Sequence, residues 1–197
     1  MDPNVIINRL IRLAKLDTTV FDEVRDDPAE LVPGIIVAAV SAFLAGIGAF
    51  LWWQMQSYTP DGNFLNNAIL GSIFLAALYA VAALVIFVVL AQMYHIQVEI
   101  NALIRTMGYA AAPLSLSLLM FIPVIWPLFS LVPLALLFVM MIYAVQSVSG
   151  ADSKQVVMAT TIGFAVMVLI LGFLALASSN TDVPMGAGQF GLIFDNR

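Results

Sequence analysis

The sequence predicts an all-α, polytopic integral membrane protein with about five transmembrane helices and an amphipathic helix at its N-terminus. Three observations support this prediction. Of 197 residues, 62% are hydrophobic and only 10% are charged, whereas a soluble domain has roughly 25% charged residues. The charges are also segregated, because no Asp, Glu, Lys, Arg or His occurs in residues 31–60, 62–94, 106–151 or 155–181. Apolar stretches longer than about 18 residues are typical of transmembrane helices.

The N-terminal segment, residues 5–16, predicts an amphipathic helix. At 100° per residue, Asn8 shares one arc with the basic residues Arg9, Arg12 and Lys15, and bulky apolar residues cover the opposite arc. A basic face beside an apolar face is typical of a helix that lies on the membrane surface. Packing on the protein's own cytoplasmic face is an equally good explanation, and the two are compatible.

The chain between this helix and the first span has its own start and stop signals. A short helix should end near Asp26, since the residue before a proline avoids the α region. Asp27 suits an N-cap, Pro28 suits the first helical position, and Glu30 falls at the third. The new helix should run to about residue 53 as the first span.

Four further spans follow in the sequence. The second is predicted at about 67–93 and the fifth at about 156–178. The third and fourth come from one apolar block, 107–149, which Pro123 and Pro127 divide at a hairpin. From residue 108 to 123 the third span is short for a bilayer, so it tilts little, starts earlier or re-enters without crossing.

Small residues predict one packing face in the first span, where Ser41, Ala45 and Ala49 recur at intervals of four. We expect three parts in the chain: a cytoplasmic N-terminal segment (1–30), a five-span membrane domain (31–178) and an extracytoplasmic Gly-rich tail (179–197). The first apolar stretch begins only near Leu31, so we expect that span to be retained rather than cleaved as a signal.

The basic residues predict the orientation. Six of the seven fall in the N-terminal segment, the second-to-third loop and the fourth-to-fifth loop, and the seventh is Arg197. Basic residues near span ends mark the cytoplasmic side. We therefore expect a multi-pass membrane protein with its N-terminus in the cytoplasm and its C-terminus outside. The net charge of −5 argues against nucleic acid as a partner.

Sites of chemistry are few, and we expect no enzyme. No span core carries an ionisable residue that would indicate a proton or ion pathway. His95 is the only histidine, and on an extended second helix it would share a face with Glu99. A surface pair explains it best, an axial ligand to a pigment or haem is the alternative, and a metal site is not expected because zinc needs three or four ligands. We expect no cofactor.

The segment LIRTMGYAAAP, residues 103–113, resembles the Yip-domain family of membrane proteins named for interaction with Ypt/Rab GTPases, specifically its prokaryotic branch. Family members tend to have a cytoplasmic N-terminal segment, five spans and a Gly-Tyr-x-x-x-Pro element, matched here by Gly108, Tyr109 and Pro113. The run LDTTVFDEVRDD, residues 16–27, is similar to the segment before the first span in bacterial members. The eukaryotic Asp-Leu-Tyr-Gly-Pro signature is absent. The resemblance implies a non-catalytic membrane adaptor in a bacterial plasma (inner) membrane.

The three matched residues also have physical explanations. We expect Gly108 to end a cytoplasmic helix in the left-handed conformation. Pro113 would then lie in the first turns of the third span. Tyr109 suits the membrane interface, with its ring in lipid and its hydroxyl in water.

Three functions remain open at this point. The first is a non-enzymatic scaffold or adaptor, whose partners are the lipid bilayer and other membrane-protein subunits. The second is an accessory subunit of a larger energy-transducing or photosynthetic complex, and the third is a channel or uniporter for a neutral solute. The tail favours docking on a neighbour, because it places four bulky apolar residues after the last span: Phe190, Leu192, Ile193 and Phe194.

Overall fold

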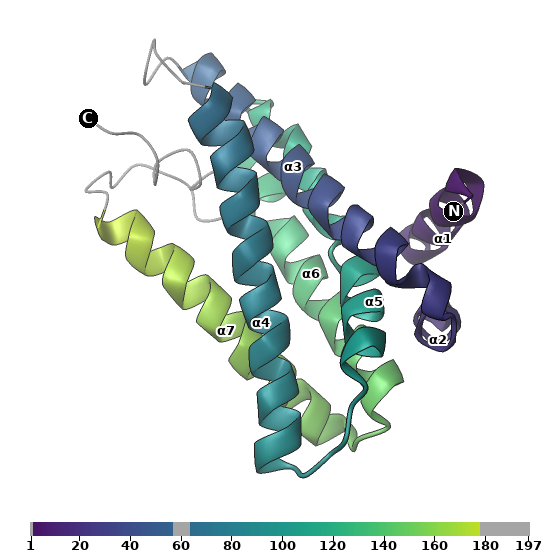
Figure 1. Ribbon diagram of the computed structural model, residues 1–197. Coiled ribbons are helices and arrows are strands. Elements are labelled where there is room, and N and C mark those ends of the chain that lie inside the picture. Colours follow the sequence, from purple (N-terminus) through teal and green to yellow (C-terminus); the bar gives the residue numbers. More distant parts are fainter. Residues whose placement is uncertain (1, 57–63, 178–197) are drawn as a thin grey trace.

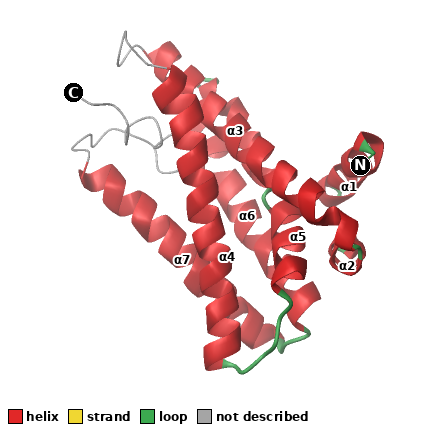
Figure 2. Cartoon of the chain, in the orientation of Figure 1, coloured by secondary structure: helices red, strands yellow, loops and turns green. Residues whose placement is uncertain are grey.

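The computed structural model describes residues 2–56 and 64–177, and within these ranges the chain is all helical with no strand. Figure 2 shows the helices joined by short loops. The α-helices are α1 (Pro3–Ala14), α2 (Thr19–Asp26), α3 (Leu31–Gln56), α4 (Gly71–Met93), α5 (Ile100–Ala110), α6 (Trp126–Ser149) and α7 (Ser153–Ala177). Three other helical segments are the 3₁₀ helices η1 (Pro28–Glu30) and η3 (Ala112–Phe121) and the π-helix η2 (Leu65–Leu70).

Five helical segments are long and apolar enough to cross a membrane, as the sequence predicts: Pro28–Trp52, Ala68–Met93, Ile100–Phe121, Trp126–Ser149 and Ser153–Phe173. They form one bundle, with α1 and α2 set to the side of it near the start of α3 (Figure 1). We call the end where α3, α5 and α7 begin the proximal end, and the opposite end the distal end. The predicted multi-pass membrane fold is therefore confirmed.

Of the three explanations for the short third span, the structure supports an earlier start. It begins at Ile100 and consists of α5 followed by η3. Pro113 lies at the second position of η3, where it supplies no N–H to an α-helical ladder. The expectation that Pro113 lies in the first turns of this span is wrong, because the apolar run begins one α-helix before it.

The first and third spans share the most extensive contact in the bundle. Helix α3 packs mainly against η3 and α5, and α4 pairs with α7. The predicted small-residue face of α3 is confirmed, since Ser41, Ala45 and Ala49 are all buried. At the distal end the rings of Trp52 and Trp126 meet edge to face, with centroids 6.0 Å apart, which packs α3 against the start of α6.

The N-terminal segment ends and restarts where the sequence predicts. Helix α2 ends at Asp26. The Asp27 side chain accepts a hydrogen bond of 3.0 Å from the backbone N–H of Ala29, so it caps η1 at the start of the first span. Pro28 occupies the first position of η1. The chain therefore leaves α2, turns at Asp27 and enters α3 directly.

Candidate functional site

Ten charged side chains meet at the proximal end, and we call them the proximal cluster. Its arginines come from α1, α2 and α5, and its carboxylates come from the N-terminal segment and the start of α5. The members are Arg9, Arg12, Arg25, Arg105, Asp17, Asp22, Glu23, Asp26, Glu30 and Glu99. The cluster thus joins elements that are far apart in the sequence.

Glu30 is the centre of the cluster, because it is a carboxylate that is only 8% exposed. One oxygen pairs with Nη1 of Arg9. The other accepts a hydrogen bond of 2.7 Å from the hydroxyl of Tyr109, which is fully buried. Burial alone would lower the pKa of Arg9, but the bonds to Glu30 and Tyr109 raise it above its usual value. Both oxygens of a buried carboxylate are thereby satisfied.

A close crossing of α3 and α5 positions Tyr109. A Cβ on Gly108 would overlap the backbone of Gly34, and one on Gly34 would lie 2.9 Å from the carbonyl oxygen of Arg105. Glycine at both positions lets the two backbones touch, as small residues do at close helix crossings. The crossing brings the Tyr109 hydroxyl to Glu30, which lies four residues before Gly34.

Arg12 ties α1 to α2. Its guanidinium pairs with Asp17 at 2.8 Å and with Glu23 at 2.8 Å, and it also donates to the hydroxyl of Thr19 at 2.9 Å. Hydrogen bonds from Thr19, followed by that from Arg12, hold the pKa of Asp17 below its usual value. The turn between the two helices is therefore fixed by charge-assisted bonds.

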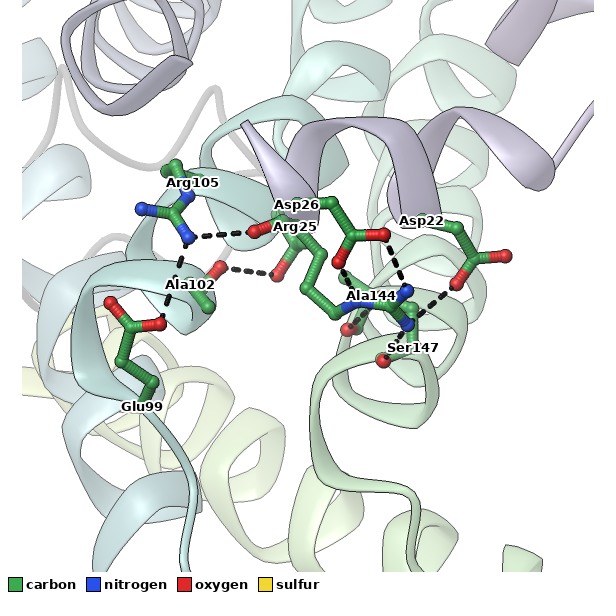
Figure 3. A network of polar contacts seen from close by, with 9 residues as sticks. Asp22, Arg25, Asp26, Glu99, Ala102, Arg105, Ala144 and Ser147 are labelled. Atoms are coloured by element: carbon green, nitrogen blue, oxygen red, sulfur yellow. Dashed lines mark hydrogen bonds and ion pairs between the residues drawn. The ribbon is translucent and has the colours of Figure 1, made fainter. Parts of the chain in front are cut away.

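Arg25 ties α2 to the end of α6. It pairs with Asp22 at 3.0 Å and with Asp26 at 2.7 Å, and its Nη1 donates to the carbonyl oxygen of Ser147 at 2.6 Å. The hydrogen bond from Arg25 lowers the pKa of Asp26. Figure 3 shows this guanidinium between the two aspartates and the end of α6.

Arg105 completes the cluster from α5. Its Nη2 donates to the carbonyl oxygen of Arg25 at 2.6 Å and lies 3.8 Å from the carboxylate of Glu99. A polar cleft of about 540 Å³ is lined by Arg105, Glu99 and Arg25, among others. Figure 3 shows the contacts of Arg105 with Glu99 and with the backbone of Arg25. Through Arg25 and Arg105, three segments of the chain, α2, α5 and α6, are bonded to one another.

A second cavity is apolar and lies within the spans. It is a groove of about 460 Å³ between α3, α4 and α5, with alanines on two of its walls. The hydroxyl of Tyr79 closes one side by donating to the carbonyl oxygen of Met107 at 2.6 Å.

The three residues predicted to face the membrane surface, Arg9, Arg12 and Lys15, have different environments in the structure. Lys15 is exposed, whereas Arg9 and Arg12 point toward the protein and pair with carboxylates. The face of α1 that points away instead carries Ile7 and Ile11, which are 54% and 50% exposed. Of the two explanations of the basic face, the packed helix therefore accounts for both arginines.

Two expectations for the matched residues are wrong. Gly108 lies inside α5, and in the described part of the chain only Leu16, His95 and Gly150 have positive φ angles. Its role is the close crossing with Gly34, not the end of a helix. Tyr109 is fully buried with its hydroxyl on Glu30, so its ring does not face lipid and its hydroxyl does not face water.

His95 does not share a helical face with Glu99. Helix α4 ends at Met93, and His95 has a φ of 56° in the loop before α5. Within residues 2–56 and 64–177, no group of three or more metal-ligating side chains occurs. The tail residues Phe190, Leu192, Ile193 and Phe194 lie outside the described residues.

Comparison with known families decides the relationship of the chain. The model of the family described as Yip1 domain matches residues 17–176. The chain belongs to the Yip1 domain family. No curated protein and no solved structure matches it. The Yip1 match starts at Asp17, so α1 lies before it, yet Arg9 of α1 binds Glu30 inside the matched region.

Sequence reasoning missed the contacts among Arg9, Glu30 and Tyr109. A signal was present, because Glu30 directly precedes the charge-free stretch 31–60, which offers it no charged partner. A carboxylate at the start of a membrane-spanning helix needs a cation or a hydrogen-bond donor nearby if it is buried. The partner depends on the crossing of α3 and α5 at Gly34, and the sequence alone does not predict that crossing.

Proposed function

We propose that this Yip1 domain protein is a non-enzymatic membrane scaffold, in which the proximal cluster holds α1 and α2 on the bundle as a surface for other proteins. The observation that supports this most is the use of the arginines. All four described arginines bond to carboxylates or carbonyl oxygens of the chain itself. These bonds fix α1 and α2 against the bundle, and the fixed helices form one surface. The carboxylates of Asp22, Asp26 and Glu99 stay 56%, 68% and 64% exposed on it.

The proposed orientation places this surface in the cytoplasm of a bacterium, with the plasma membrane around the bundle. Arg9, Arg12, Lys15, Arg25, Arg105 and Lys154 all lie on the proximal side of the spans or at their proximal ends. The basic excess supports a cytoplasmic proximal end. Partners with basic surfaces fit the exposed carboxylates by charge.

The experiment is native-gel migration of the full-length protein extracted from its own membranes in mild detergent. We expect a particle larger than one chain in detergent that dissociates as salt rises, since contacts between exposed charges are screened. Migration as a single chain at every salt concentration would exclude a salt-sensitive scaffold.

The second candidate, an accessory subunit of a larger membrane complex, is favoured by the sequence of the tail. Four apolar side chains left in water would each forgo roughly 1.5–3 kcal/mol of burial energy. Deleting residues 184–197 should leave insertion intact, because all five spans precede them, and should release the protein from the complex. Identical large particles with and without the tail would contradict docking through this segment.

A further inference from the structure

The polar cleft at the proximal end lies at the level where spans begin and end. Its polar lining consists of Arg25, Asp26, Glu99, Asn101 and Arg105. Leu31 at the start of α3 and Val148 near the end of α6 also line it. In a chain that spans a membrane, span ends lie at the level of the lipid headgroups. The cleft is therefore within reach of a headgroup.

The guanidinium of Arg105 lines the cleft, and the chain accepts hydrogen bonds from only part of it. It is 4% exposed. Nη2 donates to the carbonyl oxygen of Arg25, but among the described residues no acceptor bonds to the buried Nε. A guanidinium carries five N–H donors, and leaving buried donors without acceptors is unfavourable. A further acceptor is missing at this side chain.

The Glu99 carboxylate, in turn, has no hydrogen-bond donor among the described residues. Its nearest cation is Arg105 at 3.8 Å, which is too far for a hydrogen bond. Asp26 differs, because both its oxygens accept from Arg25, at 2.7 and 2.9 Å. Among the described residues, the cleft thus holds an arginine with one donor, Nε, that has no acceptor, next to a carboxylate that accepts no hydrogen bond from the chain.

We propose that the cleft binds the headgroup of a phospholipid that carries both a phosphate and a primary ammonium, as phosphatidylethanolamine does. The phosphate accepts from Arg105, and the ammonium donates to Glu99. A purely anionic headgroup is disfavoured by the carboxylates of Glu99 and Asp26 at the same cleft. A choline headgroup has no N–H to donate. Pockets between transmembrane helices at the membrane surface are known places of headgroup recognition, and this inference does not depend on the scaffold proposal.

The test is lipid retention by the full-length protein, measured by native mass spectrometry after exchange against phosphatidylethanolamine, phosphatidylcholine and phosphatidylglycerol with identical acyl chains. We expect phosphatidylethanolamine to be preferred over both by about tenfold, the scale of one charge-assisted hydrogen bond. Glu99→Gln should remove most of the preference over phosphatidylcholine, and Arg105→Lys should weaken retention of all three lipids. Glu99 is exposed, so its variant should fold even if Arg105→Lys does not.

Asp152→Asn is the matched control, because Asp152 is an exposed carboxylate at the same end of the bundle but outside the cleft. It should retain the preference of the parent protein. Soluble phosphoethanolamine added in excess should compete only weakly, since the lipid also gains contact with the spans. Equal retention of the three lipids, the same loss in Asp152→Asn as in Glu99→Gln, or binding of phosphoethanolamine without the lipid would each overturn the proposal.

Discussion

Glu30 shows how a single residue can connect the N-terminal segment to the spans. It ends η1, directly before α3, and its two oxygens bind groups from two distant parts of the chain, Arg9 of α1 and Tyr109 of α5. A buried carboxylate without partners would be strongly unfavourable. Each partner therefore acts partly by preventing that cost, and removing either one has a larger effect than the loss of an ordinary hydrogen bond.

Replacing Tyr109 by Phe should lower the free energy of unfolding by about 1–3 kcal/mol, because Glu30 then keeps a buried oxygen without its donor. The measurement is thermal unfolding in detergent, followed by circular dichroism. Tyr143→Phe is the control, since Tyr143 is 46% exposed on α6 and its variant should unfold like the parent. Equal stability of the parent and Tyr109→Phe would show that the hydroxyl does not support Glu30.

Replacing Gly108 by Ala tests the crossing of α3 and α5. The new Cβ would overlap the backbone of Gly34, and such overpacking costs about 1–3 kcal/mol. Gly172→Ala is the control, because nothing lies within 4 Å of a Cβ there. Alanine is the better helix former by about 1 kcal/mol, so the control should be neutral or stabilising. A stabilised Gly108→Ala variant would contradict a tight crossing.

At the scale of elements, the sequence predicted the five spans, but it placed the start of the third span too late and did not predict which way α1 faces. Charge-free apolar stretches and the signals at Asp27 and Pro28 are local, so they could be read directly. The facing of α1 depends on carboxylates of α2 and η1, which turn Arg9 and Arg12 inward and leave Ile7 and Ile11 outside. Amphipathicity gives two faces without saying what each one contacts.

The orientation of α1 predicts different effects for two basic residues of the same helix. Arg9→Gln removes the charge that faces Glu30, and breaking a buried pair in this way costs up to about 3–5 kcal/mol. Lys15→Gln changes an exposed residue and should alter stability by less than about 0.5 kcal/mol. Protease cleavage between α1 and α2, followed on gels, should accelerate only in Arg9→Gln. Similar cleavage of both variants would mean that α1 is not held through Arg9.

Acid should loosen α2 through Asp17 and Asp26. Both have pKa values lowered from 3.8 by hydrogen bonds, mainly from Thr19 and Arg25 respectively. Their contribution to stability is therefore complete above pH 3.8 and is lost as the pH falls through the lowered values. The melting temperature should drop more between pH 4 and 2 for the parent than for the double variant Asp17→Asn/Asp26→Asn, by an amount that salt reduces. Parallel curves would exclude this linkage.

At the scale of the whole molecule, the charged side chains that the structure describes are concentrated at one end of the bundle. The described arginines join α1, α2, α5 and α6 there, while the distal end closes with the packing of Trp52 on Trp126. Sequence reasoning predicted this polarity from the positions of the basic residues. It could not predict the network, since Tyr109 and Glu30 are 79 positions apart and only the folded chain brings them together.

The same polarity predicts how the molecule sits in its membrane. Basic residues at the proximal end should hold that end in the cytoplasm, because they resist transfer across the bilayer. A phosphatase reporter that is active only outside the cytoplasm should therefore work when fused at Asp61 or after Asp182, which follow the first and fifth spans. It should fail at Lys154, between α6 and α7. A cytoplasmic reporter at the same three positions is the matched control and should give the reverse pattern. Phosphatase activity at Lys154 together with silence at Asp61 would invert the orientation and move the proximal cluster, with its exposed carboxylates, to the outer face.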